Sequence, residues 1–209
     1  MKEREGIQDA QAVFKKHFGY TPAHVVKAPG RLEVLGNHTD YNDGLVMSVA
    51  VDKYIYIACA PRTDGKIEFI SSAFPEVEKF WMSEIKPNPA AHWADYVKGV
   101  LAQLRKRGVH FSGFNAAVHG TIPMGAGMSS SAALEVATAL ATRKLYPFSL
   151  TETGATIPPK RNENGELPPL APTERMFFRS FAAQRRMNSW ACSAEFWIRF
   201  RPSTARRGT

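Results

Sequence analysis

The spacing of apolar residues predicts three helices in the first 150 positions. Residues 7–18 and residues 93–104 both repeat apolar side chains every three or four positions, so each segment presents one apolar face. Residues 128–146 are rich in alanine and stop at Pro147. Alanine has the best helix propensity and proline ends a helix, so this pattern also predicts a helix.

Short runs of β-branched and aromatic residues lie between the predicted helices and indicate strands. The turn-forming sequences Asn42-Asp43-Gly44 and Asp64-Gly65 separate some of these runs, which favours antiparallel neighbours. Strands and helices mixed without regular alternation predict an α+β domain. The predicted strands are residues 24–28, 32–35, 45–51, 54–60, 66–71 and 114–119.

Composition agrees with a folded protein, since 44% of the 209 residues are hydrophobic and 22% are charged. No uncharged stretch approaches the roughly 20 residues that span a bilayer, and the first residues have no apolar signal region. The two cysteines, Cys59 and Cys192, lie far apart without metal-binding spacing. We therefore expect a cytoplasmic protein without disulfides, structural zinc or membrane contact.

The net charge of +8 is concentrated near the end of the chain. Residues 1–149 carry 17 basic and 14 acidic groups, whereas residues 150–209 carry 10 and 5. The later segment is also rich in arginine and proline, and residues 156–172 have the composition of a linker. These shifts predict a domain over residues 1–152, followed by a Pro/Arg-rich tail over 153–209 that is disordered or read out of frame.

A glycine–serine segment between the last predicted strand and the alanine-rich helix has the chemistry of a phosphate loop. Gly125 and Gly127 allow close backbone approach, and free N–H groups at a helix start attract anions. An ordinary helix cap explains the same local features equally well. The sequence lacks the Gly-Lys-Ser/Thr of a Walker loop and the third glycine of the dinucleotide fingerprint.

A second cluster, Ala28-Pro-Gly-Arg-Leu-Glu-Val-Leu-Gly-Asn-His-Thr-Asp-Tyr-Asn-Asp-Gly44, precedes this loop by some 85 residues. Together with the loop and with Trp93-Ala-Asp-Tyr-Val-Lys-Gly-Val100, it resembles the signature of galactokinases. These enzymes belong to the superfamily that includes homoserine, mevalonate and phosphomevalonate kinases. The resemblance spans about residues 8–152. It implies the N-terminal α+β domain of the galactokinase-type fold, which is ribosomal protein S5 domain 2-like, without the C-terminal α+β half.

The resemblance implies ATP-dependent phosphorylation of galactose, or a related hexose, at the anomeric hydroxyl. Arg31 would be catalytic, beside the transferring phosphoryl group, and Ser131 would help hold Mg²⁺. A place for Trp93 or Tyr96 beside adenine is one alternative, but their helical spacing favours core packing. The implied sugar-contacting residues are Asn37, His38, Thr39 and Asp40. The implied ATP-binding residues are Gly125, Ala126, Gly127, Met128, Ser129, Ser130 and Ser131.

Two departures from the galactokinase pattern bear on activity. The family usually has Glu where this chain has Asn37, and Asn where it has Glu33, so the preferred sugar is left open. Family members also place a catalytic Asp and a Mg²⁺-ligating Glu after the loop, whereas the last Asp here is Asp95. We therefore expect a truncated kinase with little or no activity alone.

Two other functions remain open at this stage. A non-catalytic sugar- or nucleotide-binding pseudokinase or sensor would keep the same binding residues. A nucleic-acid arm would use the arginines and aromatics of the tail, such as Arg199, Arg201 and Trp197. Charge-biased tails are more often simply solvated, which disfavours nucleic acid as a partner.

Overall fold

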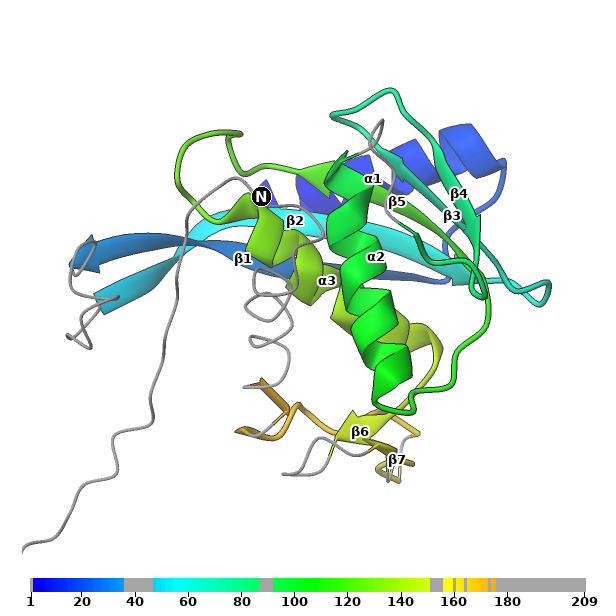
Figure 1. The fold of residues 1–209 in the computed structure, drawn as a ribbon. Helices are drawn as coiled ribbons and strands as arrows, with labels where there is room; N and C mark the ends of the chain where they lie inside the picture. Colours follow the sequence, from blue (N-terminus) through cyan, green and yellow to red (C-terminus); the bar gives the residue numbers. More distant parts are fainter. Residues whose placement is uncertain are drawn as a thin grey trace, which may run out of the picture.

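The computed structural model describes residues 2–35, 47–86, 92–150, 156–159, 161–163, 165–172 and 174–175. The described part is an α+β unit in which helices cover both faces of one mixed sheet (Figure 1). No helix within it is long and apolar enough to cross a membrane. The elements are α1 Lys2–Phe18, β1 His24–Leu35, β2 Met47–Pro61, β3 Lys66–Ser71, β4 Glu78–Trp81, α2 His92–Lys106, β5 Phe114–Gly120, α3 Ser130–Leu145, β6 Ser149–Leu150 and β7 Thr156–Ile157.

The main sheet has the strand order β1-β2-β5-β3-β4. β1 and β2 are antiparallel, as are β2 and β5 and also β3 and β4, whereas β3 and β5 are parallel. β1 is therefore an edge strand. β2 pairs with β5 only from Ile55 to Pro61, so the part of β2 before Ile55 pairs with β1 alone and extends past β5. Figure 1 shows this hairpin projecting from the body of the domain.

Alternate residues of β2 face two separate apolar clusters. Ile55, Ile57 and Cys59 join the larger cluster, which includes the buried faces of α2 and α3. Tyr56 and Ala58 face the other side and join the cluster formed with α1. Because successive side chains of a strand point to opposite faces, this period of two lets one strand serve both layers. The sheet thus holds α3 and the preceding loop on the face opposite α1.

The three predicted helices and the α+β class are confirmed, and the differences concern the strands. The predicted runs 24–28 and 32–35 form one strand, β1, which continues through Pro29. Proline is tolerated there because β1 lies at the edge of the sheet, where one row of N–H groups needs no strand partner. The described residues of the run 45–51, from Met47 on, and the run 54–60 likewise belong to one strand, β2. β4 was not predicted because it has only four residues. The turn predicted at 42–44 lies outside the described residues.

Residues beyond position 152 contact the domain, among them Pro168, Leu170 and Glu174. The Glu174 side chain is 4% exposed and accepts hydrogen bonds from the backbone N–H groups of Leu150, at 3.0 Å, and Ala171, at 2.8 Å. The Arg143 guanidinium donates to the Pro168 carbonyl at 3.1 Å and lies 3.9 Å from the Glu174 carboxylate. Burial lowers the pKa of Arg143, and the charge of Glu174 opposes this shift. This part of the segment therefore does not have the open form of a linker, while the boundary at residue 152 stays a prediction.

Glu174→Ala is expected to lower the free energy of unfolding by about 2–4 kcal/mol, because it leaves two N–H groups without their acceptor and a buried guanidinium without the nearby negative charge of Glu174. Urea denaturation measures this loss. Glu163→Ala removes an exposed carboxylate nearby and serves as the matched control, with an expected change under about 0.5 kcal/mol. Equal stabilities of the two variants would show that Glu174 is not packed as described.

Candidate functional site

The glycine–serine segment forms an exposed loop between β5 and α3. Gly125 and Gly127 have φ angles of +72° and +67°, a backbone region that residues with a Cβ rarely adopt. Residues 123–127 are exposed, and a Cβ built on either glycine would meet no atom within 4 Å. The bend is therefore open at both glycines, and it leads into α3, where N–H groups of the first turn and the helix dipole favour an anion.

Ser129, the residue immediately before α3, also has a positive φ of 56° with ψ of 42°. It is the only non-glycine residue in this region among the described positions. Its side chain makes no capping hydrogen bond, so the usual local reason for serine at a helix start is missing. Strain of this kind tends to occur at functional sites.

Ser129→Gly is expected to raise the free energy of unfolding by up to about 1 kcal/mol, because glycine adopts positive φ without a steric penalty. Ser129→Ala keeps the Cβ and the strain, so it should give no gain. Chemical denaturation of the two variants beside the unmodified chain checks this. A Ser129→Gly variant less stable than Ser129→Ala would contradict the strained geometry.

Arg31 lies beside this loop. The Arg31 backbone N–H donates a hydrogen bond to the Met128 carbonyl at 3.0 Å, which joins β1 to the loop across about a hundred residues of sequence. Gly30 makes the approach possible, since a Cβ there would lie 2.9 Å from the Met128 oxygen. The same Cβ would lie 3.1 Å from Ile122 Cδ1 and from Val51 Cγ2. The loop and the strand that carries Arg31 are thus fitted together at a glycine.

The Arg31 side chain is 18% exposed, and its Nη2 lies 3.3 Å from Oε2 of Glu33. Glu33 is two residues along β1, so both side chains are on the same face of the strand. The ion pair orients the guanidinium on β1, whose backbone meets the loop at Met128, and a guanidinium suits an anionic ligand. Sequence reasoning identified Arg31 but missed Gly30, although its place in a Pro-Gly pair before the arginine was a usable signal of close backbone approach.

The predicted sugar-contacting residues, Asn37, His38, Thr39 and Asp40, lie outside the described residues. Trp93, by contrast, is 8% exposed, and its ring stacks on that of Phe74 with a centroid distance of 6.0 Å. Tyr96 packs against the same cluster as Trp93. The prediction that these two residues pack in the core is confirmed.

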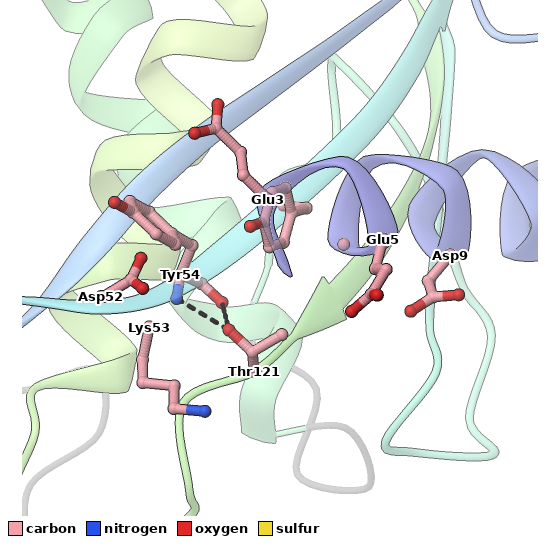
Figure 2. A pocket seen from close by; sticks show the side chains of 9 residues that line it. Glu3, Glu5, Asp9, Asp52, Lys53, Tyr54 and Thr121 are labelled. Atoms are coloured by element: carbon pink, nitrogen blue, oxygen red, sulfur yellow. Dashed lines mark hydrogen bonds between the residues drawn. The ribbon is translucent and has the colours of Figure 1, made fainter. Parts of the chain in front are cut away.

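A separate hollow of about 240 Å³ lies on the α1 side of the sheet (Figure 2). Four carboxylates line it, from Glu3, Glu5, Asp9 and Asp52, against the single ammonium of Lys53. This excess of negative charge would repel a triphosphate. The Thr121 hydroxyl accepts from the Tyr54 N–H at 2.9 Å, which fixes the hollow's rim. This hollow is therefore unsuited to a triphosphate, and the loop is the better candidate for an anion.

Two family models match the chain. "Galactokinase galactose-binding signature" covers residues 12–61, and "GHMP kinases N terminal domain" covers residues 95–157. The first match includes β1 with Arg31, and the second includes the loop and α3.

Solved structures support the same relationship. Lactococcus lactis galactokinase, crystallised with galactose, is 29% identical, with a TM-score of 0.63 over 71% of this chain. A D-glycero-D-manno-heptose 1-phosphate kinase from Bacteriodes thetaiotaomicron is 22% identical over 62% of the chain, with a TM-score of 0.52. Methanococcus jannaschii mevalonate kinase is 19% identical over 62%, also with a TM-score of 0.52. At these lower identities the last two show the fold alone.

The matched region is only part of each relative. It spans 39% of the galactokinase chain, 44% of the heptose phosphate kinase and 42% of the mevalonate kinase. The sheet order, the loop beside Arg31 and both family models nevertheless agree on one assignment. The N-terminal part of this chain carries matches to both family models and resembles the galactokinases of the GHMP kinase superfamily.

Proposed function

We propose that this chain is the ATP- and sugar-binding part of a sugar kinase. The loop residues 125–131 bind the phosphates of ATP, and Arg31 contacts the transferring phosphoryl group. Residues 37–40 bind a hexose, galactose or a close relative. The observation that carries the proposal is the hydrogen bond from the Arg31 N–H to Met128, because it places the two signature segments side by side.

The electrostatics of the loop support the nucleotide assignment. The transferring phosphoryl group spreads negative charge over its outer oxygens, so catalysis needs donors and cations fixed in advance. Here the donors are the N–H groups at the start of α3, and the cation is the Arg31 guanidinium. In this reaction the anomeric oxygen of the sugar forms a bond to the γ-phosphorus while the bond from that phosphorus to ADP breaks. The hydroxyl proton of the sugar passes to an acceptor.

Mg²⁺ would accompany the nucleotide, and the residues of the loop suit it. Mg²⁺ keeps most of its waters and takes few protein ligands, with phosphate oxygens as partners. The Ser131 hydroxyl, in the first turn of α3, would supply one such ligand. The ion would neutralise charge on the phosphates, while Arg31 and the loop N–H groups orient them.

We expect the chain alone to turn over slowly or not at all. No aspartate follows the loop, and the last one in the sequence, Asp95, is 5% exposed in α2. The sugar hydroxyl therefore has no aspartate after the loop to accept its proton. Positioning and electrostatics carry much of phosphoryl transfer, so binding should survive better than turnover.

The test uses the purified full chain with MgATP and galactose. We expect calorimetry to detect both ligands, and mass spectrometry to find at most slow formation of galactose 1-phosphate. Binding of neither ligand would overturn the proposal. Rapid formation of galactose 1-phosphate would contradict the expectation of slow or absent turnover.

A further inference from the structure

A polar cluster lies on one face of the β1/β2 hairpin next to Arg31. Glu33 of β1 pairs with Ser48 of β2 in the strand register, so their side chains leave the hairpin on the same face. Arg31, two residues before Glu33, shares that face and lies 3.3 Å from the Glu33 carboxylate through Nη2. The hairpin thus places a guanidinium, a carboxylate and a hydroxyl together.

Two atoms of this cluster are buried with unmet hydrogen bonding. The Glu33 side chain is 8% exposed, and its Oε2 faces Arg31. The other oxygen, Oε1, and the Ser48 hydroxyl are both buried, and among the described residues neither has a hydrogen-bond partner. Buried polar atoms are nearly always paired in native proteins because an unpaired one costs its full desolvation. Two such atoms at paired positions of one hairpin indicate a place where a ligand supplies the missing bonds.

The chemistry of the two atoms defines the ligand class. A carboxylate oxygen only accepts, whereas a serine hydroxyl both donates and accepts. The adjacent Arg31 cation disfavours a metal ion, and the carboxylate disfavours a phosphate directly on Oε1. A neutral ligand with neighbouring hydroxyl groups fits both atoms, since each hydroxyl can give one bond and take another.

We propose that Glu33 is a specificity-determining residue for the sugar. Its Oε1 accepts a hydrogen bond from one sugar hydroxyl, the Ser48 hydroxyl bonds the neighbouring one, and Oε2 stays on Arg31. This inference rests on the proposed function and adds a sugar contact outside residues 37–40. It also joins the two substrates, because the same carboxylate touches the sugar and the guanidinium that faces the nucleotide phosphates.

A purely structural alternative has different consequences. Rotation of both side chains could bring Oε1 and the Ser48 hydroxyl together, so that each satisfies the other and no ligand is involved. Loss of either group would then lower the stability of the hairpin without changing sugar affinity. Ligand affinity, measured separately for sugar and nucleotide, therefore separates the two readings.

The test titrates galactose, and separately the non-hydrolysable Mg·AMPPNP, into the full chain. Glu33→Gln is expected to weaken galactose binding about tenfold or more, and Ser48→Ala about fivefold. Glu76→Gln, which removes an exposed carboxylate, should leave both affinities unchanged. The affinity of Glu33→Gln for Mg·AMPPNP should stay within about twofold or rise, because Arg31 loses a negative neighbour.

The outcomes distinguish this inference from the proposed function. Unchanged galactose affinity in Glu33→Gln overturns the inference alone. An equal loss of affinity for galactose and for Mg·AMPPNP would show that Glu33 maintains the fold and does not select the sugar. Failure of the unmodified chain to bind galactose overturns the sugar assignment and the inference with it. Nucleotide binding by the unmodified chain would still uphold the phosphate loop.

Discussion

Gly30→Val is expected to weaken the binding of Mg·ATP by the full chain at least tenfold. A Cβ at this position already lies 2.9 Å from the Met128 carbonyl oxygen, which belongs to the loop backbone and cannot rotate away. The branched side chain of valine must therefore displace the loop from β1 and break the hydrogen bond from the Arg31 N–H. We expect nucleotide affinity to fall by a factor of ten or more, about 1.4 kcal/mol, with a loss of stability of about 1–3 kcal/mol.

A graded pair of variants controls this experiment. Gly30→Ala should give an intermediate loss of affinity, because it adds only the Cβ. Gly120→Ala adds a Cβ that meets only the end of the flexible Ile55 side chain, at 3.0 Å, and should leave affinity unchanged. Calorimetry on folded samples measures all three. Full nucleotide affinity in Gly30→Val would show that the fit between β1 and the loop is unimportant for binding.

The largest effect on stability is expected at an ion pair inside the domain. Lys98 Nζ of α2 donates to Glu78 Oε1 of β4 at 2.5 Å, and the two side chains are 4% and 6% exposed. Lys98→Met should lower the free energy of unfolding by about 3–5 kcal/mol, because it leaves a buried carboxylate without its cation. Chemical denaturation monitored by circular dichroism gives this value.

The double variant Glu78→Leu/Lys98→Met is the matched control. It removes both charges and keeps apolar volume next to Phe80, over whose ring the Lys98 ammonium lies at 5.2 Å from the centroid. A buried pair replaced by apolar residues often loses little, so the double variant should recover most of the stability. A double variant as unstable as Lys98→Met would contradict an electrostatic origin of the loss.

Much of the fold was readable from local patterns. Apolar spacing predicted the first two helices, alanine content and Pro147 predicted the third, and the run Lys66–Ser71 matched β3 at both ends. The parallel pairing of β3 with β5 was not predictable, because the two strands are more than forty residues apart and no tight turn connects one directly to the other. The continuity of β1 through Pro29 was missed because proline usually interrupts a strand. It is tolerated in an edge strand, and the edge position of β1 is not evident from the sequence.

The candidate site was predicted only in part, because some of its contacts depend on strand pairing and not on local sequence. The loop glycines and Arg31 are recognisable by residue type and spacing, and the structure brings them together through the Arg31–Met128 hydrogen bond. Glu33 drew attention only as a departure from the galactokinase pattern, since a carboxylate two residues after an arginine is usually an exposed ion pair. Its burial, and its pairing with Ser48, arise from the register of the hairpin, which no local pattern specifies.

We expect the loop beside Arg31 to bind a nucleoside triphosphate. The most direct test of this expectation is a titration of the ¹⁵N-labelled full chain with Mg·AMPPNP, followed by the chemical shifts of backbone amides. We predict saturable changes that are largest at residues 125–131 and at Arg31. Unchanged amides in this loop, or changes confined to the acidic hollow around Glu3 and Asp52, would contradict the account.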